Sequence, residues 1–201
     1  MTLTKNQIEK ITNYRKVPYR GISIDLVPLG LHNLDAVTKL RNQEHSKYYL
    51  NQQFDLTLDD QKKWFDKYQK RLEDIYWCIA NKENQIVGTV RLYDITQMSC
   101  EHGSFIVDQQ YTMGTPYALE AMILSLDFAF EVLELKNVEC NDRHDNTNMN
   151  SITRRFGFKY DKINVINGVE YNHYNLMKDD YDSTKYKNLL KKFMSKRCHD
   201  E

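Results

Sequence analysis

The chain lacks a long apolar run, because no stretch approaches the roughly 20 residues that a membrane-spanning helix requires. Its first segment, Met1–Lys16, is polar and charged and has no apolar core of a secretory signal. It has no excess of either charge, since 28 basic residues balance 28 acidic ones. A chain without a net field does not attract nucleic acid or anionic membranes globally. We therefore expect a soluble, cytoplasmic protein that binds neither.

Cysteine is scarce, and the four residues Cys78, Cys100, Cys140 and Cys198 do not have the spacing of metal ligands. Three of them lie in or beside strand-like stretches, as buried thiols of a reducing compartment do. Internal repeats, low-complexity runs and linkers are absent too. The length suits one domain with a proper core, so we predict a single domain over residues 1–201 without a metal.

The segment Glu101–Leu135 has the most informative pattern. Phe105–Val107 favours a strand, Tyr111–Pro116 is a polar turn, and the apolar residues that follow recur three and four apart, as on a buried helix face. Thr115 is expected to cap this helix, with Pro116 at its first position. Free N–H groups at the start of such a helix make an anion site, and an ordinary strand–helix junction with nothing bound is the alternative.

Elsewhere the spacing of apolar residues predicts the remaining elements. An alternating period predicts strands near residues 22–29, 76–80, 86–93, 137–140, 158–165 and 169–177, the last two joined by a turn at Asn167–Gly168. Periods of three and four predict helices near 34–42, 57–72, 146–155 and 182–194, the last one rich in lysine. Residues 48–55 are expected to form a loop, and residues 2–19 a short helix or an extended arm. This order predicts an α/β domain with a mixed, mostly antiparallel central sheet flanked by helices.

Together, these features resemble the GNAT superfamily of acyl-CoA N-acyltransferases. The resemblance covers about residues 22–177 and is nearest the branch of ribosomal-protein and nucleotide-sugar amine acetyltransferases. It leaves the polar N-terminal arm and the lysine-rich C-terminal helix outside the core. The features that carry it are the element order, Gly88-Thr89 late in the second central strand, the turn Gly114-x-Pro116-Tyr117-Ala118-x-Glu120-Ala121, and the closing segment from Asn146 to Gly157-Phe158.

The resemblance implies that acetyl-CoA binds at the turn. The family's turn usually has Arg or Gln, two residues, Gly, any residue, then Gly or Ala; here Tyr111 holds the first place and Pro116, which has no N–H, the last. The pantetheine arm is expected between two splayed strands, where one backbone N–H stabilises the developing oxyanion. The residues implied for the cofactor are Ile106, Val107, Thr112, Met113, Gly114, Thr115, Tyr117, Asn146 and Arg155.

Two of these residues have an ordinary structural alternative. Asn146 resembles the residue that holds the cofactor arm through its side-chain amide, but asparagine also favours helix caps. Arg155, with Arg154 beside it, resembles a ligand of the ribose 3′-phosphate, but both can belong to a solvated helix face.

Glu101 is the candidate general base, acting through a water, because this branch often has a glutamate before the glycine at Gly103 on the central strand. A solvated strand end is the alternative. His102 is expected on the opposite face of the strand, in a structural role. The family's general acid is a tyrosine seven residues after the asparagine, and Thr153 holds that place here. Tyr160, Tyr111 or a water then replaces it, or the thiolate leaves unprotonated.

The acceptor is expected to bind at Arg41, Asn42, Tyr48 and Tyr49, which combine a cation, an amide and aromatic faces. Packing of the two tyrosines under the loop is the alternative. The resemblance implies acetylation of a small primary amine, first a nucleotide-linked amino sugar and second a protein N-terminus. A catalytically degenerate acyl-CoA-binding domain is the third hypothesis, consistent with Pro116 and Thr153. The pattern leaves open whether the chain forms a homodimer.

Overall fold

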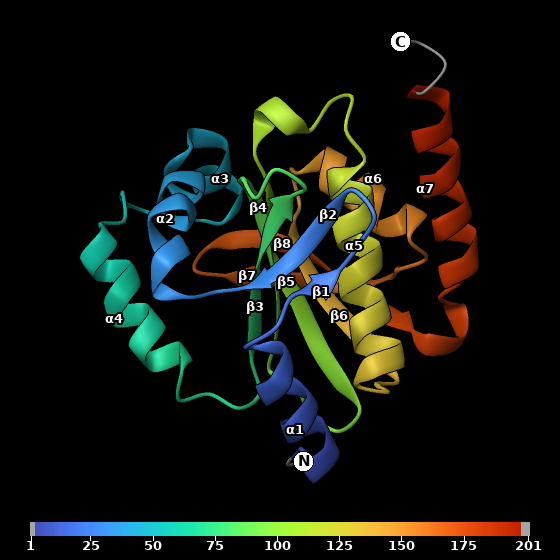
Figure 1. The fold of residues 1–201 in the computed structure, drawn as a ribbon, viewed down its shortest axis with the longest axis horizontal. Helices are drawn as coiled ribbons and strands as arrows, with labels where there is room; N and C mark the ends of the chain where they lie inside the picture. Colours follow the sequence, from blue (N-terminus) through green and yellow to red (C-terminus); the bar gives the residue numbers. More distant parts are fainter. Residues whose placement is uncertain (1–2, 198–201) are drawn as a thin grey trace.

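The computed structural model describes residues 3–197, which form one eight-stranded sheet with helices on both faces (Figure 1). The strand order is β1-β2-β3-β4-β5-β6-β8-β7, and the strands pair antiparallel except for the parallel pair β5 and β6. Cys198 lies outside the described residues. No helix in the described part of the chain has the length and apolar character needed to cross a membrane.

The strands are β1 (Tyr19–Arg20), β2 (Ile24–Pro28), β3 (Ile75–Asn81), β4 (Ile86–Tyr93), β5 (Ser99–Val107), β6 (Asn137–Arg143), β7 (Lys159–Ile166) and β8 (Val169–Met177). The α-helices are α1 (Lys5–Tyr14), α2 (Leu34–Asn42), α3 (Glu44–Tyr49), α4 (Leu58–Tyr68), α5 (Tyr117–Asp127), α6 (Thr147–Arg155) and α7 (Ser183–Arg197). Short helical turns are η1 (Leu31–Asn33), η2 (Gln109–Tyr111), η3 (Phe128–Val132) and η4 (Lys178–Asp180).

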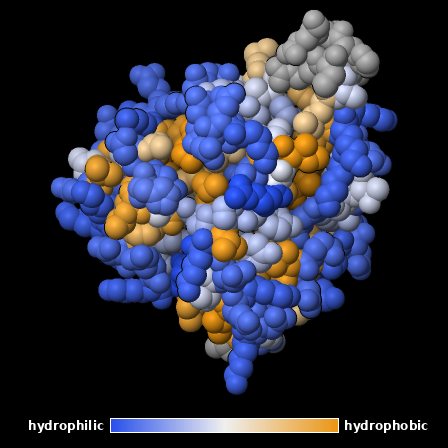
Figure 2. All heavy atoms as spheres, viewed as in Figure 1, coloured by the Kyte–Doolittle hydropathy of each residue, from blue (hydrophilic) through white to orange (hydrophobic). Residues whose placement is uncertain are grey.

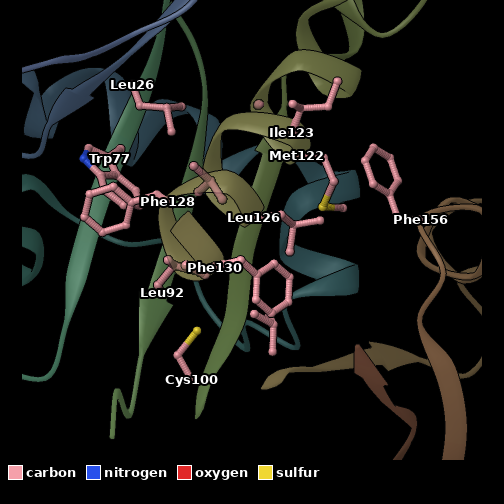
Figure 3. Packing of buried hydrophobic residues seen from close by; sticks show 14 of the residues in the cluster. Leu26, Trp77, Leu92, Cys100, Met122, Ile123, Leu126, Phe128, Phe130 and Phe156 are labelled. Atoms are coloured by element: carbon pink, nitrogen blue, oxygen red, sulfur yellow. The ribbon is translucent and has the colours of Figure 1, made fainter. Parts of the chain in front are cut away.

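Strand β3 shows how the sequence period builds the two cores. Ile75, Trp77 and Ile79 face the larger core beneath α1, α5 and η3, whereas Tyr76 and Cys78 face the smaller core beneath α2 and α4. Side chains of successive strand residues point to opposite faces, so a strand covered on both sides is apolar throughout. Figure 3 shows Trp77 and Leu26 from the sheet packed against Phe128, with Leu126 and Phe130 nearby in the same core.

The predicted architecture is confirmed, and two local predictions need correction. Helix α5 begins at Tyr117 rather than Pro116, and the Thr115 hydroxyl donates to the Tyr111 carbonyl instead of capping the helix. Tyr48 lies in helix α3 rather than in a loop. Residues 44–49 are helical although they have no apolar period that would predict a helix. Of the two alternatives for the N-terminal arm, the short helix is confirmed: it is α1, which Thr4 caps with reciprocal bonds to Gln7.

The crossover between β5 and β6 contributes buried apolar residues to the larger core. Helix α5 continues into the π-helical turn η3, where Phe128 and Phe130 are fully buried. The apolar spacing that predicts one long helix there corresponds to this pair of elements. In Figure 1, α5 covers one face of the sheet, and α6 and α7 lie next to it.

Candidate active site

A groove opens where strands β5 and β6 separate. The two strands pair only between Ser99–Glu101 and Asn137–Glu139; beyond Glu101, β5 stays with β4 and β6 stays with β8. The resulting hollow has a volume of about 640 Å³ and is bordered by β5, α6, the turn before α5, and α3. This is the splayed strand pair expected from the sequence.

A close approach of backbones shapes the β5 wall of this groove. The pairing of β4 with β5 shifts register between Thr89 and Arg91, and Ser104 has a φ of 47°. A Cβ atom on Gly88 would lie 2.2 Å from the carbonyl oxygen of Ile106, so only glycine fits there. Gly88 therefore has a steric reason to occupy the position that the sequence pattern singled out.

Val107, rather than Ile106, presents its backbone to the groove. The Asp108 N–H donates to the Val87 carbonyl at 2.8 Å, and the Ile106 carbonyl oxygen also points toward β4. Because backbone groups alternate along a strand, the N–H and C=O of the intervening Val107 point to the other edge, toward β6. The Ile106 side chain lines the groove together with Val107.

The turn before α5 keeps its amide groups available. The hydroxyl of Thr112 donates to the Gln109 carbonyl at 2.8 Å, and its own N–H also bonds Gln109. The N–H groups of Met113, Gly114 and Thr115 donate to no other group among the described residues. Gly114 has a φ of +74° with no atom within 4 Å of an added Cβ, so the glycine serves conformation there. The N–H of Tyr117, the first helical residue, has no partner within the helix by helix geometry.

Glu101 stands at the apex of the opening, at the last residue pair between β5 and β6. Its Oε1 accepts hydrogen bonds from the Tyr93 hydroxyl at 2.5 Å and from the Asn141 amide at 3.1 Å, while Oε2 has no donor among the described residues. Burial, and then the Glu101 carboxylate, raise the pKa of Tyr93 well above its usual value, so Tyr93 stays protonated as the donor. Glu101 does not itself line the groove, and its side chain lies on the face of the sheet opposite to that of His102.

That opposite face carries polar side chains, and we call it the polar face; it comprises Glu101, Glu139, Asn141, Asp161 and His173. His173 links the two further carboxylates, with Nε2 3.4 Å from Glu139 and Nδ1 3.2 Å from Asp161. Both carboxylates are partly exposed to solvent. An amine that approaches Glu101 from this side meets a carboxylate-rich surface. The described residues contain no cluster of three or more side chains suited to hold a metal.

His102 points to the other face, as predicted. It is buried, its Nε2 lies 3.0 Å from the Ser125 hydroxyl of α5, and burial lowers its pKa to about 4. A neutral histidine enclosed in the core has no access to substrate. His102 is therefore structural.

Thr153 is fully buried and donates to Asp142 at 2.5 Å, so it does not reach the groove. Asn146 caps α6 by accepting from the Met149 N–H at 3.1 Å, and it also lines the groove. The two alternatives that the sequence left for Asn146 are thus compatible. Arg155, at the end of α6, borders the groove and is exposed.

Tyr49 is predicted from the sequence to bind the acceptor, but the structure places it on the groove expected for the cofactor. It lines the same hollow as Ile106, Val107 and Asn146, with its ring 4.8 Å from that of His45. The other tyrosines considered from the sequence lie elsewhere. Tyr160 is 54% exposed on β7, and Tyr111 donates to Gln85 at 3.3 Å.

The remaining acceptor candidates take part in intramolecular contacts. Asn42 holds the loop after α3, with its Oδ1 accepting from the Leu56 N–H at 2.9 Å. The Tyr48 hydroxyl donates to Asp145 at 2.6 Å, and the guanidinium of Arg143 lies 3.8 Å from the centre of the Tyr48 ring. Arg41 does not line the groove, and its Nε is buried without a hydrogen-bond partner among the described residues.

Sequence comparison matches residues 24–159 to the acetyltransferase (GNAT) domain family. No curated protein matches the chain. Solved structures share the fold. A GCN5-related N-acetyltransferase from Brucella melitensis is 20% identical, with a TM-score of 0.74 over 87% of this chain and 86% of that one.

Two further structures differ in what their descriptions name. Apo FdhC, a nucleotide-linked sugar GNAT, is 21% identical with a TM-score of 0.73, over 87% of this chain and 97% of that one. Spermidine N-acetyltransferase from Vibrio cholerae, in complex with CoA and spermine, is 18% identical with a TM-score of 0.71, over 79% of this chain and 98% of that one. At these identities the likeness establishes the fold, not the acceptor.

Proposed function

Because the chain belongs to the GNAT acetyltransferase family, whose members use acyl-CoA, we propose that it transfers an acetyl group from acetyl-CoA to a small primary amine bound beside Glu101. One observation carries the proposal. Glu101 occupies the point where β5 and β6 part, with one carboxylate oxygen fixed by Tyr93 and Asn141 and the other without a protein donor. A positioned carboxylate at the apex of a groove is what proton removal from an amine requires.

The described residues fit acetyl-CoA. The free N–H groups of Met113, Gly114 and Thr115, together with the start of α5, suit a pyrophosphate. Val107 offers a backbone N–H toward the groove, and Asn146 borders it with its side chain. When bound, acetyl-CoA supplies an activated thioester carbonyl. The Val107 N–H would polarise that carbonyl and stabilise the oxygen on which charge develops.

Glu101 would take a proton from the ammonium form of the acceptor, directly or through a water on Oε2. Tyr93 and Asn141 hold Oε1, so the free oxygen keeps a fixed direction. Only the neutral amine has the lone pair that attacks the thioester, so proton removal must precede bond formation.

Tyr49 would return a proton to the departing sulfur. It lines the groove beside Val107 and Asn146, whereas Thr153, which holds the family's tyrosine place, is enclosed with Asp142. A phenol supplied by α3 would then replace the one that the family draws from the closing segment.

Two acceptor classes have separate support. The partly exposed carboxylates of Glu139 and Asp161 near Glu101 favour an amine that carries a second positive charge. The half-buried cation of Arg41 on α2, and the Tyr49 and His45 rings that line the groove, favour a nucleotide-linked amino sugar, whose diphosphate an arginine can bind.

The test is a panel of amines assayed by release of free thiol from acetyl-CoA, together with cofactor binding to a variant of the turn. Gly114→Asp should abolish acetyl-CoA binding in calorimetry, because its carboxylate repels the phosphates. Gly114→Asn is the matched control, since it is similar in size and also tolerates the left-handed conformation. Equal affinity of Gly114→Asp and Gly114→Asn for acetyl-CoA would remove the turn from the site. If the chain binds acetyl-CoA but acetylates no amine of the panel, the catalytically degenerate domain is favoured.

A further inference from the structure

A second hollow, of about 780 Å³, continues the groove past the turn and ends against helix α7. The two hollows share Phe105, Thr112, Ala118, Ile152 and Arg155, so they form one continuous depression. Its far wall is formed by α7, through Tyr186 and four residues that lie on one helix face at spacings of three and four: Lys185, Asn188, Leu189 and Lys192. Figure 2 shows apolar side chains exposed between the hydrophilic surface of α7 and the neighbouring helix α5.

The charges around this second hollow are one-sided. Its lining contains Arg155, Lys185 and Lys192 but no carboxylate, although the whole chain has as many acidic as basic residues. Neither Lys185 nor Lys192 forms an ion pair within the described residues, whereas Lys187 on another side of the helix pairs with Asp127 at 2.6 Å. Apolar walls with three unneutralised cations suit a flat aromatic group that carries a phosphate.

Helix α7 is held firmly in place. Leu190 is buried, the Tyr186 hydroxyl donates to the Arg155 carbonyl at 3.1 Å, and the Tyr186 ring stacks on Phe156 at 4.5 Å between centres. The lysines are therefore presented on an ordered support that is tied directly to α6. The matched family segment ends at residue 159 and does not include α7.

We propose that α7 completes the acetyl-CoA site of this chain, with Lys185 and Lys192 binding the 3′-phosphate of the adenosine and the apolar wall receiving the adenine. This inference rests on the proposed function and assigns a role to a helix that lies outside the matched segment. The covalent order of the ligand supports it. With the thioester near Val107 and the pyrophosphate at the turn, the adenosine 3′-phosphate comes next, and the next hollow along the groove is the one beside α7.

The test compares CoA with 3′-dephospho-CoA, which differs only by that phosphate, in calorimetric titrations of the full chain. The parent protein should bind CoA at least roughly tenfold more tightly, as expected for charge-assisted bonds to a phosphate. The double variant Lys185→Ala/Lys192→Ala should bring the ratio close to one while leaving the affinity for 3′-dephospho-CoA within about twofold. Lys185→Gln/Lys192→Gln, which keeps most of the side-chain length, should behave alike.

Lys191→Ala is the matched control, because Lys191 is an exposed cation of the same helix that does not line the hollow. It should leave the ratio of the parent unchanged. The proposal is overturned if the parent binds both ligands equally, if the double variants keep the ratio, or if they weaken both ligands alike. In the first of these cases thiol release from acetyl-CoA would still uphold the proposed function, whereas failure of the parent to bind either ligand would overturn both.

Discussion

The two faces of strands β5 and β6 use the same kinds of ionisable side chain for different ends. On the polar face, Glu101 is held by a tyrosine and an amide and keeps one oxygen free. On the core face, one residue further along each strand from Glu101 and Asn141, His102 and Asp142 are buried beneath helices α5 and α6. Burial lowers the pKa of His102 to about 4 and raises that of Asp142 to about 6.

This difference shows that the alternation of a strand, not the residue type, decides whether an ionisable side chain meets solvent or is enclosed in the core. Groups of the core face are removed from solvent, so their protonation changes the free energy of unfolding. Groups of the polar face meet solvent and solute, so their protonation is expected to change the rate. Substitutions on each face should therefore produce different kinds of defect.

The largest expected effect is on the polar face. Glu101→Gln should lower kcat between about a hundredfold and ten-thousandfold at neutral pH, because it removes the proposed base. The loss should shrink as the pH approaches the pKa of the acceptor, where free amine becomes abundant. Steady-state kinetics across pH check this, with Glu139→Gln as a control that removes a neighbouring carboxylate of the same face. A Glu101→Gln variant with the pH profile of the parent would leave Glu101 a structural residue.

The core face should respond in stability. Because the pKa of Asp142 is raised from 3.8 to about 6 on folding, the folded state favours the protonated form, and this carboxyl's contribution to stability decreases as the pH rises from about 4 to about 6. The full change is about 3 kcal/mol. In Asp142→Asn, urea unfolding should show stability that rises more steeply with pH than in the parent. An unchanged slope would mean that Asp142 does not titrate in this range.

His102 should change the free energy of unfolding with pH in the opposite direction. Its pKa is lowered from 6.5 to about 4, so the folded state favours the neutral form, and its contribution is present above pH 6.5 and lost as the pH falls toward 4. The change is again about 3 kcal/mol at most, and it nearly cancels that of Asp142 in the parent. His102→Gln should therefore leave stability that increases on acidification from pH 6 to 4, measured by the same urea titrations. Stability that still falls on acidification would assign the slope to other groups.

A smaller effect is expected at Tyr49, which lines the groove from helix α3. Tyr49→Phe should lower kcat by about tenfold and leave acetyl-CoA affinity within about twofold, if its hydroxyl protonates the leaving sulfur. An acyl donor whose thiol is more acidic should restore the rate, because such a thiolate leaves without a proton. Tyr48→Phe, which removes a neighbouring hydroxyl bound to Asp145, is the control. Equal losses in the two variants would point to packing of α3.

The smallest effect concerns the acceptor. Arg41→Ala should raise the apparent KM for a nucleotide-linked amino sugar severalfold and leave acetyl-CoA affinity unchanged, because a diphosphate is bound equally in ground and transition states. Lys39→Ala removes a cation of the same helix that already pairs with Asp35 and serves as the control. If only peptide amines are acetylated, the protein N-terminal alternative replaces the sugar. If polycationic amines react best, Asp161→Asn should raise the KM for such an amine, and Arg41→Ala should leave it unchanged.

The sequence predicted elements where burial imposes a period and missed those where it does not. Strands β3 and β4 are short, nearly continuous runs of buried residues, and helix α5 repeats its apolar residues three and four apart, so all three elements could be predicted. Helix α3 buries only Ser46, so nothing in its composition indicated a helix.

The site divides in the same way. The turn at Gly114 and the position of Glu101 follow from local pattern. The relation of Tyr49 to Val107, and of Lys192 to Arg155, depends on how distant elements pack. No spacing along the chain encodes those distances.

The short parallel contact between β5 and β6 also has a consequence for how the chain folds. Strands β3, β4 and β5 follow one another across short connections, and β7 and β8 form a hairpin to which β6 adds, so these two sets close largely by local contacts. Joining the two sets closes the crossover through α5 and η3. In the sheet, this step forms only three residue pairs between β5 and β6. Contacts of low sequence separation form early, and those that close long loops form late. Pulsed hydrogen exchange during refolding should therefore protect the β3–β4 and β7–β8 hairpins before the amides of β6 that face β5.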